Sequence, residues 1–71
     1  MEILGERFNL GDVVQITHKV ESDKYKGTSI SAGRISYLGE FKNGDSVLHL
    51  DFDNGYSELI IAKTISKIEI C

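Results

Sequence analysis

Two Asn-Gly dipeptides, Asn43-Gly44 and Asn54-Gly55, constrain the fold of this 71-residue chain more than any other feature of its sequence. Both residues of such a pair tolerate a positive φ, so the dipeptide is typical of the two-residue turns that join neighbouring antiparallel strands. Each dipeptide lies between runs that are rich in apolar and β-branched residues. The sequence therefore predicts two consecutive hairpins, which together make a meander of three strands.

Five short runs favour β-strand, and turn residues separate them. The chain has no proline, and no segment keeps the 3.6-residue period of an amphipathic helix. The runs cover residues 12–18, 29–41, 46–52, 56–62 and 66–70. Ala62-Lys63-Thr64 is expected to form one short 3₁₀ turn before the last run. We therefore expect a single all-β domain over residues 1–71, with residues 1–7 as a candidate flexible N-terminal extension.

Counting outward from two-residue turns places the large apolar side chains of the meander on one face. The expected inward set is Ile35, Tyr37, Leu48, Leu50, Phe52, Leu59 and Ile61. The opposite face is expected to carry three rows, namely Leu38 with His49 and Ile60, Ser36 with Asp51 and Glu58, and Arg34 with Asp53 and Tyr56. Asp51 and Glu58 stand directly opposite each other in this register, which destabilises a strand pair. This costly pair makes the outward face the first candidate for a binding surface.

The order of the segments resembles that of SH3-like barrels, in particular the bacterial and ribosomal KOW-type variants. The resembling segments are Leu10–Ile16, the polar loop 17–29, Ala32–Ile35, the meander and Ile65–Ile70. The resemblance covers residues 8–70 and implies a five-stranded SH3-like barrel with the 3₁₀ turn before its last strand. Eukaryotic SH3 domains bind PxxP peptides in a groove that includes a tryptophan, and this chain has none. The resemblance thus implies a fold and leaves the ligand open.

Composition and charge narrow the classes of function. The net charge of −3 arises in residues 37–71, where six acidic residues face three lysines. A domain that binds nucleic acid usually has the opposite balance. The longest apolar run, Leu59–Ala62, is far shorter than a membrane span, and the N-terminus has no secretory pattern. Since Cys71 is the only cysteine, no internal disulfide can form, and we expect a cytoplasmic location.

The sequence contains no motif for nucleophilic or metal catalysis. No serine lies in a G-x-S-x-G context, no glycine-rich phosphate loop is present, and Cys71 is the last residue. His49, Asp51 and Glu58 share the expected outward face, but three ligands on a flat strand surface lack the closed geometry of a structural metal site. We therefore expect no enzymatic activity, no cofactor and no metal.

Two binding functions remain. The first is a protein-interaction module, such as a regulator or inhibitor encoded by a bacterium or a phage, which binds a partner with a basic rim. Its expected binding face consists of Arg34, Leu38, His49, Asp51, Glu58 and Ile60. The same face is a candidate for homodimerisation, and a structural role within a larger complex is a further hypothesis. The alternative function is RNA or DNA binding through the 17–29 loop, with Lys24, Tyr25, Lys26 and Arg34 as the contacting residues.

Overall fold

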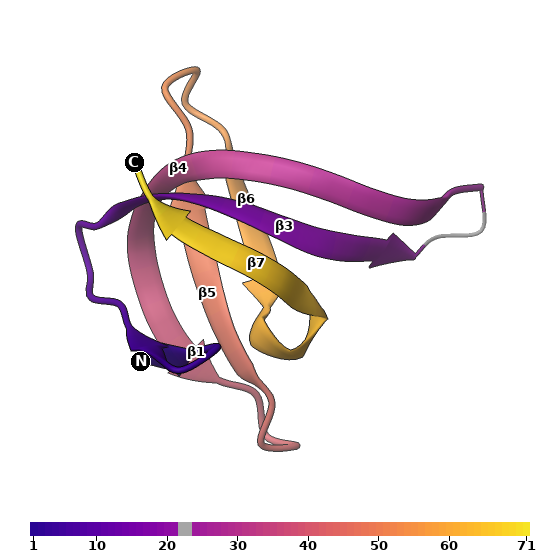
Figure 1. The fold of residues 1–71 in the computed structure, drawn as a ribbon, viewed down its shortest axis with the longest axis horizontal. Helices are drawn as coiled ribbons and strands as arrows, with labels where there is room; N and C mark the ends of the chain where they lie inside the picture. Colours follow the sequence, from indigo (N-terminus) through magenta and orange to yellow (C-terminus); the bar gives the residue numbers. More distant parts are fainter. Residues whose placement is uncertain (22–23) are drawn as a thin grey trace.

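The computed structural model describes residues 1–21 and 24–71, and these residues form short strands and one 3₁₀ turn (Figure 1). The elements are β1 (Glu2–Ile3), β2 (Glu6–Arg7), β3 (Val13–Glu21), β4 (Lys26–Glu40), β5 (Ser46–Asp51), β6 (Ser57–Ile61), η1 (Ala62–Thr64) and β7 (Ile65–Ile70). The expected all-β class and the 3₁₀ turn before the last strand are confirmed. Ser22 and Asp23, which belong to the expected 17–29 loop, lie outside the described residues.

The five longer strands form one antiparallel sheet in the order β6-β5-β4-β3-β7. The long strand β4 belongs to two layers, because its residues 26–34 pair with β3 whereas its residues 34–40 pair with β5. The chain curves over along β4, so that one layer (β3, β4 and β7) covers the other (β4, β5 and β6), as Figure 1 shows. Among the described residues the end strands β6 and β7 are not paired with each other, so the sheet is not the closed barrel that was expected.

The hydrophobic core lies between these two layers, and strands from both contribute to it. Its buried side chains are Ile3, Phe8, Val14, Ile16, Ile35, Leu48, Leu50, Ile60, Ile65 and Ile68. Met1, Leu38 and Phe52 pack against this cluster and are partly buried. The predictions that Ile35, Leu48, Leu50 and Phe52 face inward are therefore confirmed.

The first seven residues belong to the packed domain, although the sequence made them a candidate flexible extension. They form the small hairpin of β1 and β2, in which Glu2 pairs with Arg7 and Ile3 pairs with Glu6. The Met1 amino group donates a hydrogen bond to the Phe8 carbonyl at 2.9 Å, and Ile3 is buried in the core. The hairpin packs on the domain because its Ile3 and the following residue, Phe8, are buried in a core that is small in a chain of this length.

Both Asn-Gly corners are three-residue turns, not the expected two-residue turns. The Phe41 amide donates to the Asp45 carbonyl at 2.9 Å, and the Phe52 amide donates to the Tyr56 carbonyl at 2.8 Å. Of the residues in each turn, only the glycine has a positive φ, +92° at Gly44 and +88° at Gly55. This is the arrangement in which a type I turn is followed by a left-handed glycine in a bulge.

The asparagine side chains explain this choice of turn. Asn43 Oδ1 accepts a hydrogen bond from the Asp45 amide, and Asn54 Oδ1 accepts one from the Tyr56 amide, each at 3.0 Å. An asparagine that bonds to the backbone two residues later holds the chain in a local turn of its own. The glycine alone then supplies the left-handed residue, and each turn takes one residue more than the dipeptide suggests.

Because each turn has one extra residue, the pairing of β5 with β4 and the pairing of β5 with β6 both shift by one residue. In the structure His49 pairs with Tyr37 and with Leu59, whereas the expected partner of both Tyr37 and Leu59 was Leu50. A shift of one residue reverses the faces of a strand. The inward predictions for Tyr37, Leu59 and Ile61 are therefore wrong, and Leu38 and Ile60 face the core instead. A bulge between Ile35 and Tyr37 returns Ile35 to the inner face, opposite Leu50.

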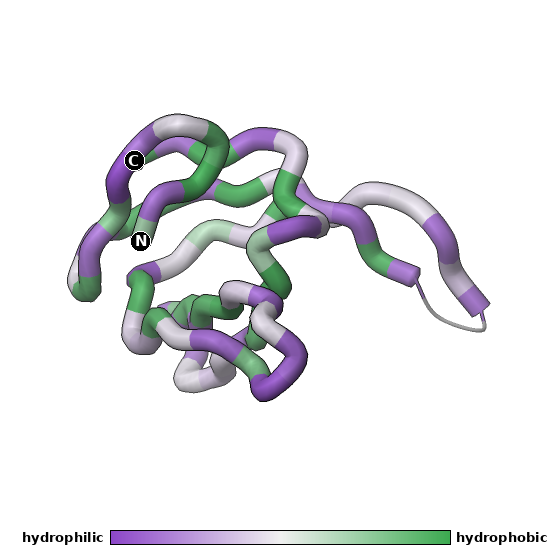
Figure 2. The backbone as a smooth tube through the Cα atoms, turned by 90° about the horizontal axis from the view of Figure 1, so that it is seen from below, coloured by the Kyte–Doolittle hydropathy of each residue, from purple (hydrophilic) through white to green (hydrophobic). Residues whose placement is uncertain are grey.

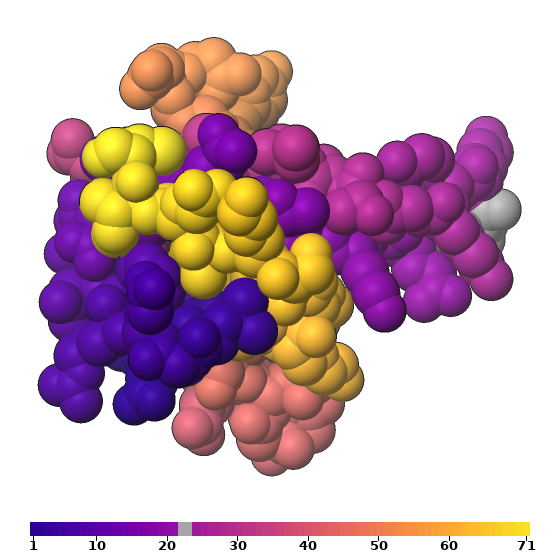
Figure 3. Space-filling view, in the orientation of Figure 1, coloured from indigo at the N-terminus to yellow at the C-terminus, as the bar shows by residue number. Residues whose placement is uncertain are grey.

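The 17–29 segment is mostly strand and not a loop. Pairing between β3 and β4 continues to Glu21 and Lys26, beyond the last pair of β3 with β7, which joins His18 to Ile65. We call residues 19–21 and 24–28 the arm, because this end of the β3–β4 hairpin projects away from the rest of the molecule (Figure 3). The arm is a two-stranded ribbon that no third described strand accompanies.

Candidate binding surfaces

The six residues of the expected protein-binding face do not lie on one face. Leu38 and Ile60 belong to the core side, and the Glu58 side chain also points inward. Asp51 pairs with Arg34 on one side and with Ser57 on the other, so it does not stand opposite Glu58. The prediction that Asp51 and Glu58 stand opposite each other is therefore wrong, because each Asn-Gly turn contains one residue more than expected. His49 and Asp51 lie where they were expected, on the outward side of β5, and the exposed Arg34 shares that side because it pairs with Asp51.

The outward side of the β4–β5–β6 layer carries an apolar cluster beside the exposed pair of Arg34 and Asp51. Tyr37, His49 and Leu59 form one cross-strand row, and Val47 and Ile61 are opposite each other in the next. We call these five residues the outer face. Exposed fractions of 50% for Tyr37 and 44% for Leu59 place two large apolar side chains in solvent, whereas Val47 is buried although it lies outside the main core.

Tyr37 organises this outer face. Its ring meets the His49 ring edge to face, with 5.6 Å between the ring centroids and 78° between the planes. The same ring lies over Gly39, where a side chain would overlap the tyrosine hydroxyl. Since Gly39 pairs with Val47, this position of the ring is consistent with the burial of Val47. The outer face is thus a small packed cluster with a tyrosine held in a fixed position.

The sequence did contain a signal for this second apolar face. Val47-Leu48 and Leu59-Ile60-Ile61 are consecutive apolar residues, so they place apolar side chains on both faces of β5 and β6. Continuous apolar runs are typical of strands that are covered on both sides, whereas a strand with one solvated face alternates. Nothing among the described residues covers the outer face as the core covers the inner one.

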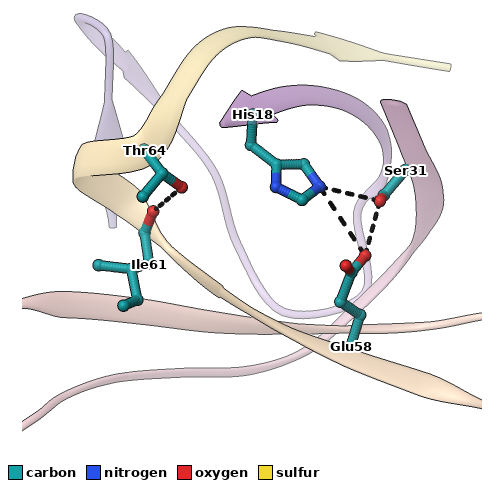
Figure 4. A network of polar contacts seen from close by, with 5 residues as sticks. All are labelled: His18, Ser31, Glu58, Ile61 and Thr64. Atoms are coloured by element: carbon teal, nitrogen blue, oxygen red, sulfur yellow. Dashed lines mark hydrogen bonds and ion pairs between the residues drawn. The ribbon is translucent and has the colours of Figure 1, made fainter. Parts of the chain in front are cut away.

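A polar network crosses the interior between the two layers (Figure 4). His18 from β3, Ser31 from β4 and Glu58 from β6 meet there, although β6 pairs with neither of the other two strands. The Ser31 hydroxyl donates to Glu58 Oε1 at 2.6 Å, and His18 Nε2 lies 3.0 Å from Ser31 Oγ and 3.9 Å from Glu58 Oε1. His18 and Ser31 are buried, and Glu58 is partly exposed. We call this network the polar brace.

The atoms of the polar brace are arranged for structure and not for nucleophilic attack. In a Ser-His-Asp triad the imidazole lies between the hydroxyl and the carboxylate and removes the hydroxyl proton. Here the hydroxyl lies in the middle and donates its hydrogen bond to Glu58, so Ser31 Oγ accepts from an Nε2–H of His18. The sequence did not lead us to place His18 in the interior, because the first predicted strand ended at that residue. Alternation continued from Val14 and Ile16 would have placed His18 on the inner face.

The four residues proposed for nucleic-acid contact divide into two groups. Lys24, Tyr25 and Lys26 lie at the tip of the arm and are exposed. Lys26 Nζ is 3.5 Å from Glu21 Oε1, which offsets part of the positive charge. Arg34 lies eight residues from Lys26 along β4, about 26 Å of extended strand, where the sheet passes from one layer to the other. Arg34 therefore does not extend the basic tip.

Arg34 instead borders an open hollow beside the middle of β4. This hollow measures about 440 Å³, and Asp51, Phe52 and Asp53 line its other side. In the described part of the chain, no three His, Cys, Asp or Glu side chains are grouped closely enough to hold a metal ion. No helix of the described chain is long and apolar enough to cross a membrane.

Comparison with protein-family models, with curated proteins and with solved structures finds no match to this chain. The case for a function therefore rests on the geometry of the outer face, the arm and the polar brace.

Proposed function

We propose that this chain is a non-catalytic protein-binding module with an SH3-like arrangement of strands, and that the outer face is its recognition surface. The order β6-β5-β4-β3-β7, the long β3–β4 hairpin and the 3₁₀ turn before β7 support the SH3-like part of the proposal. The strongest support for the binding part is the row of Tyr37, His49 and Leu59, in which Tyr37 and Leu59 are exposed and His49 is half-buried.

An exposed apolar row of this kind promotes aggregation unless a partner covers it. Contiguous apolar surface on a small protein marks interaction sites, and interface centres are enriched in tyrosine and poor in charge. The outer face fits this description, since none of its five residues is Asp, Glu, Lys or Arg. Tyr37 is already fixed by its contacts with His49 and Gly39, so less side-chain freedom is lost on binding.

Replacing Tyr37 by serine or Leu59 by lysine is expected to reduce partner binding at least about tenfold, because truncating a central apolar contact removes a large share of binding energy. The measurement is quantitative affinity capture from cells that express the protein, followed by mass spectrometry and by titration of the captured partner. Ile30→Lys is the matched control, since Ile30 is also exposed (65%) but belongs to the other layer. Equal loss of binding with Ile30→Lys would argue against the outer face.

Direct nucleic-acid binding through the arm is the second candidate function. The observation in its favour is the position of Lys24, Tyr25 and Lys26 at the tip of a projecting ribbon, where a base can stack on the exposed tyrosine ring (Figure 3).

If the arm binds single-stranded nucleic acid through Lys19, Lys24 and Lys26, the logarithm of the affinity should fall with the logarithm of salt concentration at a slope of about −2. Fluorescence anisotropy with labelled oligonucleotides at low and moderate salt measures this slope. The double variant Lys24→Glu/Lys26→Glu should abolish binding, and Lys63→Glu serves as a lysine control outside the arm. Absence of binding at low salt would eliminate this function.

A further inference from the structure

The free edge of β6 lies beside a hollow that the arm overhangs. β6 is an end strand of the sheet, and among residues 1–21 and 24–71 it pairs only with β5. Residues 19–21 of β3 pair only with β4, because the pairing of β3 with β7 stops at His18. These two unpaired edges border one hollow of about 230 Å³, lined by residues 18–21, residues 58–61 and Thr64. Figure 2 shows the arm continuing past the rest of the chain.

β6 has few of the features that usually protect an edge strand from pairing. Such features are outward lysines, inward-pointing charges, prolines, bulges and very short length. The sequence of β6 is Ser-Glu-Leu-Ile-Ile and its register with β5 is unbroken, so its one protective feature is the inward charge of Glu58, which a basic side chain on an added strand would neutralise. The other end strand, β7, carries the exposed ion pair of Lys67 and Glu69 at 3.1 Å. The two end strands of the described sheet therefore differ, and of the two β6 is the more open to strand addition.

The arm leaves space for one more strand in the layer below it. By alternation Val20 points to the same side as Ile16 and His18, yet it is only partly buried. A strand added beside β6 would lie beneath the arm and cover Val20. It would also continue the outer face, because its outward residue opposite Leu59 would extend the row of Tyr37, His49 and Leu59.

From this geometry we propose that β6 binds an extended segment of a protein partner as an added strand, with a basic side chain opposite Glu58 and a β-branched apolar side chain opposite Ile60. Glu58 and Ile60 are neighbours on the inner side, so these two partner residues are separated by one residue. That middle residue faces outward beside Leu59 and is apolar or aromatic. Glu58 is partly exposed, and Ser31 and His18 both approach its Oε1, which leaves Oε2 for a cationic group. The inference rests on the proposed function, since it describes how the partner of the outer face engages β6.

Two synthetic peptides, acetyl-Thr-Lys-Tyr-Val-Thr-amide and acetyl-Thr-Val-Tyr-Lys-Thr-amide, test both strand directions. We expect at least one to produce saturable amide shift changes in the ¹⁵N spectrum at residues 57–61 and 19–21, together with slower hydrogen exchange in β6. Residues of β7 should not respond. No saturable change with either peptide, or a change centred on β7, would overturn the proposal.

The charge requirement is tested separately from the strand requirement. Replacing the peptide lysine by glutamine should weaken binding up to about fivefold, the upper range for one cross-strand pair, and Glu58→Gln should produce a similar loss. The glutamine keeps the acceptor for Ser31, so the polar brace and the fold are retained. A peptide with proline in place of tyrosine should not bind, because proline lacks the amide and the extended pairing. Equal affinity for a peptide with glutamate in place of lysine would contradict the role of Glu58.

The Tyr37→Ser variant separates this inference from the proposed function. Tyr37 lies on β4, two strands away from the β6 edge. If Tyr37→Ser abolishes partner capture while neither peptide binds, the outer face is a binding surface and strand addition is wrong. If a peptide binds to β6 but Tyr37→Ser leaves partner capture unchanged, the outer face is not the recognition surface.

Discussion

Replacing Ile60 by alanine is expected to lower the free energy of unfolding by about 2–5 kcal/mol, whereas the same change at Leu59 should cost less than about 1 kcal/mol. Ile60 is 2% exposed and belongs to the core cluster, but the neighbouring Leu59 is 44% exposed on the outer face. The first change leaves a cavity between the two layers, and the second removes atoms that are partly in water. Urea unfolding followed by circular dichroism measures both values.

This pair of variants also tests the register of β6 directly. A hairpin with a two-residue turn would bury Leu59 and expose Ile60, so the two costs would then be reversed. A domain of this size has a total stability of about 5–15 kcal/mol at most, and Ile60→Ala is thus expected to unfold a large fraction of the molecules or to lower the melting temperature strongly. A larger cost for Leu59→Ala than for Ile60→Ala would contradict the structure.

The elements of the fold could be predicted from the sequence, but the pairing of the strands could not. The five longer strands and the 3₁₀ turn follow from local composition, which the sequence displays directly. The register depends on whether Asn54 takes a positive φ or bonds to the Tyr56 amide, and both choices suit an Asn-Gly pair. The energetic difference between the two turns is set by packing of the whole sheet. One uncertain residue therefore changed the expected face of every side chain in β6.

The residues expected on the candidate surface depended on the register of the strands. Because the register was wrong by one residue, the surface that was expected to be acidic carries an apolar cluster instead. The region itself, the outward side of the meander, remained the best candidate surface, and His49 is common to both descriptions. Glu58 moved from that surface to the interior, where it joins two residues from β3 and β4 that are distant in sequence. Such a three-strand contact depends on the folding over of β4, which local patterns do not encode. The protruding arm was likewise unpredictable, because its polar residues are equally typical of a loop.

Removing the Ser31 hydroxyl is expected to destabilise the protein by about 1–3 kcal/mol, although the side chain loses a single atom. Ser31 Oγ is the central atom of the polar brace, since it donates to Glu58 and accepts from His18. In Ser31→Ala the buried His18 Nε2–H loses its partner at 3.0 Å, and the carboxylate, at 3.9 Å from Nε2, is too distant for a good hydrogen bond. Glu58 can recover part of its loss from water because it is partly exposed.

Ser36→Ala is the matched control for this prediction. Its hydroxyl also donates to a carboxylate, Asp51 Oδ1 at 3.0 Å, but both groups are exposed, so water replaces the lost contact at a cost within about 0.5 kcal/mol. Thermal and urea unfolding of the two variants give the comparison, with each kcal/mol expected to change the melting temperature by about 4–8 °C. The double variant Ser31→Ala/Glu58→Ala should cost less than the sum of the single changes, because each single change removes the same Ser31–Glu58 hydrogen bond. Equal costs for Ser31→Ala and Ser36→Ala, or strict additivity in the double variant, would show that the polar brace does not hold β6 against β3 and β4.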